Sequence, residues 1–170
     1  MPHMIRTERL LLRPVQMRDA AELAQAFNTP SLARQTGTIP YPVTADYLRL
    51  RIRHWIKCQG NSQFGFAVRR GGRVIGQLGF GHVVNRRWNL GYSLAQPLWG
   101  MGLGTEAVQA FCFFGFHTLK IKEIEASVFI DNPASAKVLE KFGFQGTVGR
   151  ASEWSVARGV RVPVNNYVLT

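Results

Sequence analysis

The spacing of apolar residues divides the chain into short strands and helices. Residues 9–13 predict the first strand, which ends at Pro14 because proline has no amide donor. A helix is predicted over residues 17–27, and the prolines around residues 31–43 predict a loop. Thr44 is a suitable N-cap for the next helix. The apolar side of that helix is formed by Leu48, Ile52, Trp55 and Ile56.

The hydrophobic period changes to two in the middle of the chain. Strands are predicted over residues 64–68 and 74–80, joined by Arg70-Gly71-Gly72-Arg73, in which both glycines accept a positive φ. A third strand over residues 88–94 completes an antiparallel meander, and Pro97 ends its hydrogen-bond ladder.

The last third of the chain is predicted to contain two helices and three strands. These elements are a helix over 102–119, a strand over 124–129, a helix over 133–142, a short strand from Phe144 and a strand over 162–169. The complete order is β-α-α-β-β-β-α-β-α-β-β. We therefore expect one α+β domain over residues 1–170, built on a mostly antiparallel sheet.

The composition agrees with a packed globular domain. The 170 residues are 46% hydrophobic and 18% charged, which is too apolar for a disordered chain. No apolar stretch approaches the ~20 residues needed to cross a bilayer, and the pattern of the first residues leads us to expect no signal peptide. Cys58 and Cys112 are too few for a disulfide scaffold, and no two histidines have a ligand spacing. We expect a cytoplasmic protein with no membrane association and no metal site.

The charge narrows the class of partner. Lys and Arg number 21 against 10 Asp and Glu, a net charge of +11, which favours nucleic acid, phosphorylated cofactors or acidic surfaces. The basic residues are dispersed along the chain, so the charge does not choose among these partners.

A glycine-rich segment, Trp99-Gly100-Met101-Gly102-Leu103-Gly104-Thr105-Glu106, separates a predicted strand from the longest helix. Its glycines allow a ligand to approach the backbone, and the free amides at a helix start bind phosphate oxygens. A Walker motif is excluded because no lysine follows Gly104. From Gly102, the looser dinucleotide pattern G-x-G-x-x-A matches as far as Ala107 and stays a distant alternative.

A second segment that joins a strand to a helix covers residues 131–144. Asp131 or Asn132 can cap the helix, Pro133 fits its first turn, and Gly143 can end it. Helix capping leaves Ser135, one turn inside the helix, without a structural role.

Together, three groups of residues resemble the GNAT (Gcn5-related N-acetyltransferase) superfamily, and within it the RimJ/RimL-like branch of ribosomal-protein acetyltransferases. They are Thr7 to Pro14, Gly91 to Leu94 with Trp99 to Ala107, and Asn132 to Phe144. The resemblance implies the GNAT fold, a mixed sheet splayed between its fourth and fifth strands (88–94 and 124–129) and flanked by helices. It also implies acetyl-CoA as the donor, a primary amine as the acceptor, and no metal.

The resemblance assigns the binding of CoA to specific residues. The amides from Gly100 to Thr105 would hold the pyrophosphate, the backbone near Tyr92 would pair with the pantetheine arm, and Lys137 or Lys141 would meet the ribose phosphate. A solvated surface position is the alternative for either lysine. The implied cofactor-binding residues are Tyr92, Ser93, Leu94, Trp99, Gly100, Met101, Gly102, Leu103, Gly104, Thr105, Asn132 and Lys141.

The same resemblance places the hydroxyl of Ser135 close to the sulfur, as a candidate general acid. The strand position two before Gly91 is commonly glutamate in the family, but here it is Asn89, which cannot accept a proton. We consider Glu153 as the replacement, located in a loop-rich stretch. An ion pair of Glu153 with Arg150 or Arg158, or a water relay through Tyr92 or His82, is the alternative.

The expected function is therefore an acetyl-CoA-dependent N-acetyltransferase that works by direct attack, without an acyl-enzyme. The acceptor would be a protein N-terminus, including a ribosomal one, or a small amine. Ribosome association and a homodimer are compatible with this interpretation. The alternative is a non-catalytic module with a CoA fold that binds nucleic acid or the ribosome, and Asn89 favours it.

Overall fold

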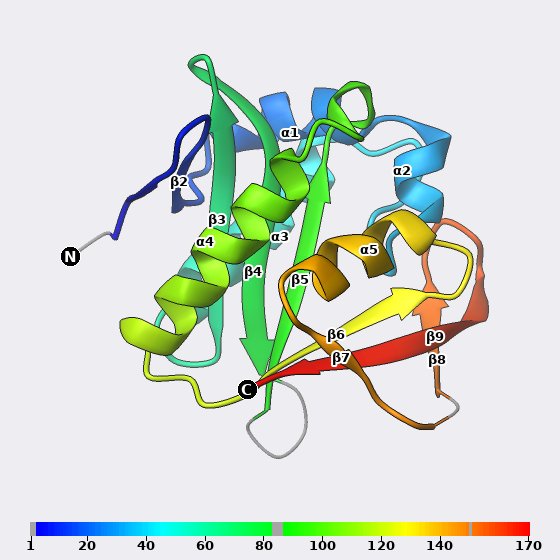
Figure 1. Ribbon diagram of the computed structural model, residues 1–170. Coiled ribbons are helices and arrows are strands. Elements are labelled where there is room, and N and C mark those ends of the chain that lie inside the picture. Colours follow the sequence, from blue (N-terminus) through cyan, green and yellow to red (C-terminus); the bar gives the residue numbers. More distant parts are fainter. Residues whose placement is uncertain (1–2, 83–86, 150) are drawn as a thin grey trace.

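A computed structural model describes residues 3–82, 87–149 and 151–170, except for the side chain of His82 (Figure 1). Within these residues one mixed sheet has the order β1-β2-β3-β4-β5-β6-β9-β7, and β8 pairs with β9. The strands are β1 Ile5–Arg6, β2 Leu11–Pro14, β3 Gln63–Arg70, β4 Arg73–His82, β5 Trp88–Leu94, β6 Ile124–Phe129, β7 Gln145–Gly146, β8 Ala151–Ser155 and β9 Val160–Leu169. The helices are α1 Asp19–Phe27, α2 Pro30–Arg34, α3 Ala45–Cys58, η2 Gln96–Leu98 (a 3-10 helix), α4 Leu103–His117 and α5 Pro133–Lys141.

The sheet is split between β5 and β6. These two strands are parallel, and they pair only at Trp88 with Ile124 and at Asn89 with Glu125. Beyond these pairs the strands diverge, and Figure 1 shows them leaving a common end as the two arms of a V. The described sheet thus has the splay that the resemblance implies between the fourth and fifth predicted strands.

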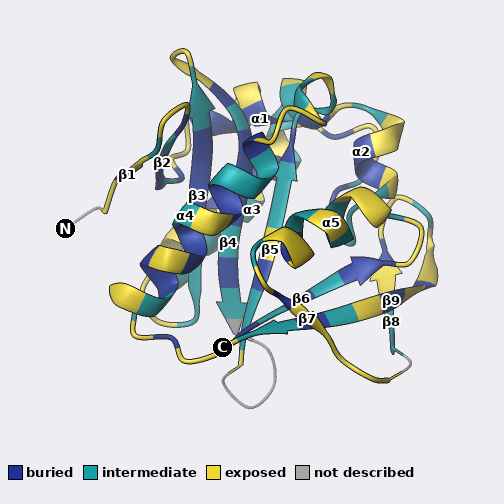
Figure 2. Cartoon of the chain, viewed as in Figure 1, coloured by how far each residue is buried: buried dark blue, intermediate teal, exposed yellow. Residues whose placement is uncertain are grey.

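Helices cover both faces of the sheet. On one face α4 and α5 pack on a core in which the rings of Phe80 and Phe111 stack with centroids 4.3 Å apart. On the other face α1, α2 and α3 close a second core around Phe27, Leu48 and Ile52. Figure 2 shows the exposed residues of α4 and α5 on their outward sides. Each face therefore has the apolar layer that the strand and helix periodicities predict.

Several local predictions are confirmed. Gly71 and Gly72 have φ values of 56° and 82°, as the predicted hairpin requires. The strands β5 and β6 have the predicted bounds. Thr44 caps α3, because its side-chain oxygen accepts a hydrogen bond from the amide of Tyr47 at 3.2 Å.

The structure also corrects the prediction in three places. The region predicted as a loop contains α2, which is capped by Thr29 and starts at Pro30. The stretch around Glu153, predicted to be rich in loops, forms strand β8. Ile56, expected on the apolar side of α3, is 47% exposed. The polar sequences of α2 and β8 gave no clear pattern, because both elements are stabilised by contacts with distant parts of the chain.

No described helix has the length and apolar character needed to cross a membrane.

Candidate active site

A cavity of about 1340 Å³ occupies the split between β5 and β6. The glycine loop and the first turn of α5 line one part of it, while the segment from Gln35 to Thr38, α3 and β8 line another. Segments that are far apart in the chain therefore meet around one space, which is large enough for a ligand of several groups. The cavity is lined by Ser135, by Glu153 and by all of the implied cofactor-binding residues except Met101.

The glycine loop presents its backbone to this cavity. Gly100 and Gly102 both have a φ of 77°, and Gly102 is the N-cap of α4 without a side-chain cap. In the described chain the first amide to bond back to Gly102 is that of Glu106, at 3.1 Å. The amides of Leu103, Gly104 and Thr105 thus precede the first helical hydrogen bond, and together with the helix dipole they favour an anion.

Glu106 holds this loop against the N-terminal segment. Its carboxylate accepts hydrogen bonds from the Thr7 hydroxyl at 2.5 Å, the Arg9 amide at 2.9 Å and the Arg9 Nε at 2.7 Å. Arg9 Nη1 also donates to the carbonyl of Met101 at 2.9 Å. Burial opposes ionisation of Glu106, but these hydrogen bonds and the Arg9 charge outweigh it and lower the pKa of Glu106. Thr7 and Arg9 belong to the residues that resemble the family, but only the structure shows that they hold the glycine loop in place.

Two predicted residues use their polar atoms within the fold. The indole Nε1 of Trp99 donates to the carbonyl of Leu94 at 2.7 Å and fastens the loop to the end of β5. Asn132 caps α5, because its Oδ1 accepts a hydrogen bond from the amide of Ser135 at 3.1 Å. Asp131, the other capping candidate, instead forms a two-point ion pair with Arg158 at 2.8 and 2.9 Å.

Ser135 contacts Tyr92 across the split. The two hydroxyl oxygens lie 2.7 Å apart, and the Tyr92 hydroxyl also donates to the Ser135 carbonyl at 3.1 Å. Burial raises the pKa of Tyr92 to about 12, and the hydrogen bond from Ser135 opposes this only in part. The phenol is therefore neutral at physiological pH. Sequence reasoning assigned no structural role to Ser135, and the structure shows that its hydroxyl forms a hydrogen bond with the hydroxyl of Tyr92.

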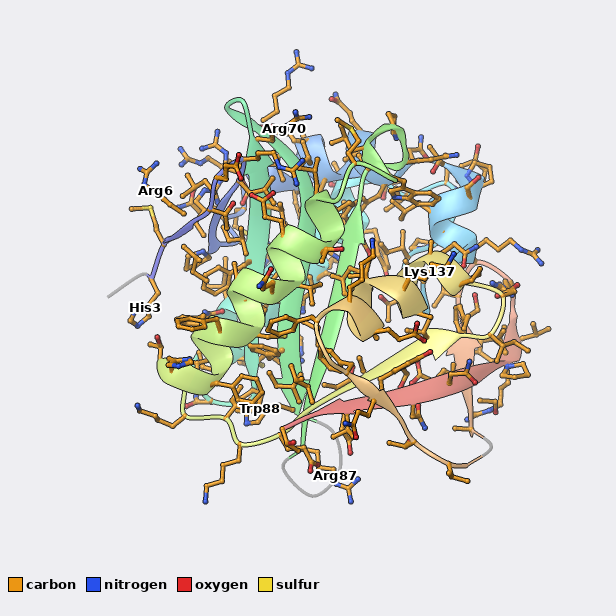
Figure 3. All side chains as sticks on the ribbon, viewed as in Figure 1. His3, Arg6, Arg70, Arg87, Trp88 and Lys137 are labelled. Atoms are coloured by element: carbon orange, nitrogen blue, oxygen red, sulfur yellow. The ribbon has the colours of Figure 1, made fainter. Side chains whose placement is uncertain are left out.

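The alternative considered for Glu153, an ion pair with Arg158, is wrong, because Arg158 binds Asp131. Glu153 lies on β8 at the rim of the cavity, with an exposed side chain. Its other expected partner, Arg150, lies outside the described residues, and so does the side chain of His82. Lys137 and Lys141 both line the cavity with exposed side chains, and Figure 3 shows Lys137 on α5.

Sequence reasoning missed the polar face of β6. Glu125 and Ser127 alternate with the buried residues of this strand, so their side chains share one face, and both residues line the cavity. Glu125 forms an ion pair with Arg87 at 2.7 Å, and Ser127 donates to Asn166 at 3.0 Å. The period of two within residues 124–129 was a signal that could have identified this face.

No group of three or more His, Cys, Asp or Glu side chains within the described ranges is arranged to hold a metal ion.

Comparison with known proteins shows that the chain is similar to acetyltransferases. A family model described as "Acetyltransferase (GNAT) domain" matches residues 9–145. The chain is 31% identical over 168 residues to "Uncharacterized N-acetyltransferase p20" of Bacillus licheniformis, covering 96% of this chain and 93% of that protein.

Two solved structures share the fold. One is ribosomal-protein-S5-alanine acetyltransferase from Vibrio fischeri, with a TM-score of 0.84 at 22% identity over 98% of this chain and 96% of that one. The other is Mycobacterium smegmatis RimJ in complex with CoA-disulfide, with a TM-score of 0.84 at 22% identity over 99% of this chain and 86% of that one.

Proposed function

The chain belongs to the GNAT family and is an acetyltransferase, and from this premise we propose that it moves the acetyl group of acetyl-CoA to a primary amine by direct attack. The observation that carries the proposal is the split between β5 and β6, with free helix amides at one end and the Tyr92–Ser135 contact across it. The whole of residues 1–170 would act as one GNAT domain, since strands from Ile5 to Leu169 join the same sheet.

The residues around the split fit a CoA thioester, the donor that GNAT acetyltransferases use. A Cβ built on Gly100 meets no atom within 4 Å, so a diphosphate can approach the loop backbone closely. The amides up to Thr105 would hold that diphosphate, and Lys141 or Lys137 would meet the ribose phosphate. Among the described strands none pairs with the β6 side of β5 beyond Asn89, which leaves that edge for the amides of the pantetheine arm.

The chemistry of the split is that of acyl transfer. A backbone amide of β5 near Tyr92 would donate to the thioester oxygen as negative charge develops there, and one such donor contributes ~3–4 kcal/mol in other enzymes. When the new C–N bond has formed and the C–S bond breaks, Ser135 would give its hydroxyl proton to the leaving sulfur. The neutral Tyr92 phenol beside it can return a proton to the serine oxygen and regain one from solvent.

The acceptor is proposed to be a peptide N-terminus or a small amine. A ribosomal acceptor is supported by the fold shared with an enzyme named for ribosomal protein S5 alanine, and by the net charge of +11, which favours a partner rich in RNA. Glu153, at the rim, would attract the positive charge of the acceptor.

Two measurements test the proposal. Acetyl-CoA should raise the melting temperature of the protein more than NAD does at the same concentration. Thiol release should then appear with at least one member of a panel of primary amines that includes a peptide beginning with alanine and an aliphatic diamine. Stabilisation by acetyl-CoA without thiol release from any amine would favour the non-catalytic alternative, and stabilisation by NAD alone would favour the dinucleotide motif.

A further inference from the structure

An amine can attack a thioester only after it has lost a proton, and Asn89 cannot accept one. The parallel pairing of β5 with β6 sets Glu125 directly beside Asn89, at the last pair before the strands diverge. Paired residues of neighbouring strands lie ~5 Å apart and point to the same face. The fold therefore supplies a carboxylate one strand away from the position where the sequence lacks one.

Glu125 has the surroundings of a residue that binds a ligand. Its side chain is 27% exposed and lines the cavity. Its Oε1 accepts a hydrogen bond from Arg87 at 2.7 Å, and its Oε2 accepts none from any residue that the structure describes. Figure 3 shows Arg87 at the start of β5, at the closed end of the split. Arg87, the ion-pair partner of Glu125, also lies near the charge of Glu123, and the partner of Glu125 on β9 is the apolar Val168.

The competing carboxylate is less well placed. Glu125 and Glu153 are the two carboxylates that line the cavity within the described chain. Glu153 is exposed on β8, which reaches β6 only through β9, whereas Glu125 adjoins β5 itself. Asn89 and Tyr92 are three residues apart on β5, about 10 Å along the strand, so their side chains point to opposite faces of the sheet. An acyl group held in the split would then have the proton acceptor on one side and the Tyr92–Ser135 pair on the other.

Unpaired acceptor atoms also line this cavity. Gln35, Gln63 and Gln77 each have a buried side-chain oxygen without a hydrogen-bond partner in the described structure, and Gln77 is only 6% exposed. Buried acceptors of this kind destabilise a protein unless a donor reaches them. They favour an acceptor that carries N–H donors in addition to its reacting nitrogen, as a peptide does.

We propose that Glu125 binds the ammonium group of the acceptor and takes its proton, in the role that glutamate at position 89 has in the resembling family. An N–H bond of the ammonium breaks, an O–H bond forms on the carboxylate, and the freed electron pair attacks the thioester carbon. As the C–S bond then breaks and the sulfur takes the Ser135 proton, the nitrogen loses its second proton to solvent and becomes the amide. The proton leaves Glu125 to solvent after the product departs. This assignment rests on the proposed acetyl transfer to an amine.

The test is the pH profile of kcat/KM for the amine that the wild-type protein acetylates fastest in the panel. Glu125→Gln should lose ~100-fold or more near pH 7, the size expected for general base catalysis. The loss should shrink as the pH approaches the pKa of the amine, because the amine is then already deprotonated in solution and needs no general base. Glu123→Gln, which changes an exposed glutamate two residues away, is the matched control and should keep the wild-type profile.

Two further variants separate a proton acceptor from a structural residue. Asn89→Glu combined with Glu125→Gln should recover ~10-fold or more of the lost rate, because the carboxylate returns on the neighbouring strand. Glu153→Gln should raise KM for the amine without changing the shape of the profile. All variants should retain the thermal stabilisation by acetyl-CoA, which shows that they fold and bind the donor.

A wild-type profile in Glu125→Gln would overturn the assignment of Glu125 and leave acetyl transfer intact. If Glu153→Gln instead shows the loss near pH 7 that shrinks toward the pKa of the amine, the role of proton acceptor moves to Glu153. A wild-type protein that binds acetyl-CoA but acetylates no amine of the panel would contradict the proposed function, and the assignment of Glu125 with it.

Discussion

The hydroxyl oxygens of Tyr92 and Ser135 lie 2.7 Å apart, although 43 positions separate the two residues in the chain. Each residue is held from a different side. Tyr92 is fixed by the pairing of β5 with β4, and Ser135 by the capped first turn of α5. Because burial raises the pKa of Tyr92 to about 12, the pair keeps its protons at physiological pH and can donate one to a leaving group.

Ser135→Ala tests this pair at the scale of one residue. We expect kcat to fall ~100-fold, the lower end of the contribution of a general acid, with KM for acetyl-CoA little changed. Ser93→Ala is the control, since it removes a hydroxyl from the same cavity while keeping the backbone of β5. Steady-state kinetics with both substrates varied gives the two parameters. Equal turnover of Ser135→Ala and Ser93→Ala would remove Ser135 from the mechanism.

At the scale of elements, the start of α4 combines a left-handed glycine with a side-chain brace. Gly102 adopts a φ of 77°, and the Arg9–Glu106 interaction holds the loop before it. A glycine is needed there because a Cβ in this conformation costs ~1–2 kcal/mol. The first residues of α4, Leu103 to Thr105, line the cavity, and their amides precede the first helical hydrogen bond to Gly102.

Gly102→Ala should therefore lower the free energy of unfolding by ~1 kcal/mol and weaken the binding of acetyl-CoA. A Cβ at this position would also lie 3.4 Å from Arg9 Nη2 and disturb the brace. Gly60→Ala is a matched control, because Gly60 has a φ of 84° with open space around it and does not line the cavity. It should cost similar stability and leave the dissociation constant of acetyl-CoA unchanged, as measured by titration calorimetry. Equal affinity in the two variants would show that the loop conformation does not serve the donor.

At the scale of the molecule, a buried ion pair joins the sheet to the helices behind it. Arg13 on β2 and Asp19 on α1 meet through two hydrogen bonds of 2.6 and 2.7 Å, with side chains 8% and 2% exposed. The same carboxylate accepts the amide of Gln16 at 2.8 Å and so fixes the start of α1. Removing one partner would leave a charge buried without compensation.

Arg13→Met should thus destabilise the protein by ~3–5 kcal/mol, and Arg13→Met combined with Asp19→Leu should be more stable than the single variant. Arg49→Met breaks the exposed Arg49–Asp46 pair of α3 and should cost less than ~1 kcal/mol. Urea unfolding of the four proteins, with the wild type included, measures these differences. If the double variant is no more stable than Arg13→Met, the loss of stability in Arg13→Met does not come from the unpaired buried charge of Asp19.

Local sequence patterns were sufficient to predict several strands and loops of this fold. The bounds of β5 and β6, the Gly71–Gly72 hairpin and the glycine loop all follow from residue types and their spacing, because each depends on neighbours in the chain. Strand β8 and helix α2 escaped detection because partners far along the sequence hold them. Among these are β9 for β8, and the second core for Leu32 of α2.

The linear order of residues was thus sufficient for the acetyltransferase motifs, since a glycine turn and a capped helix start are defined over a few positions. The pairings across the split depended on the folded chain. Tyr92 meets Ser135, and Glu125 stands beside Asn89, only because β5 and β6 begin as neighbours and then diverge. No spacing along the chain encodes that divergence, because it arises from how two halves of a twisted sheet pack against their separate helices.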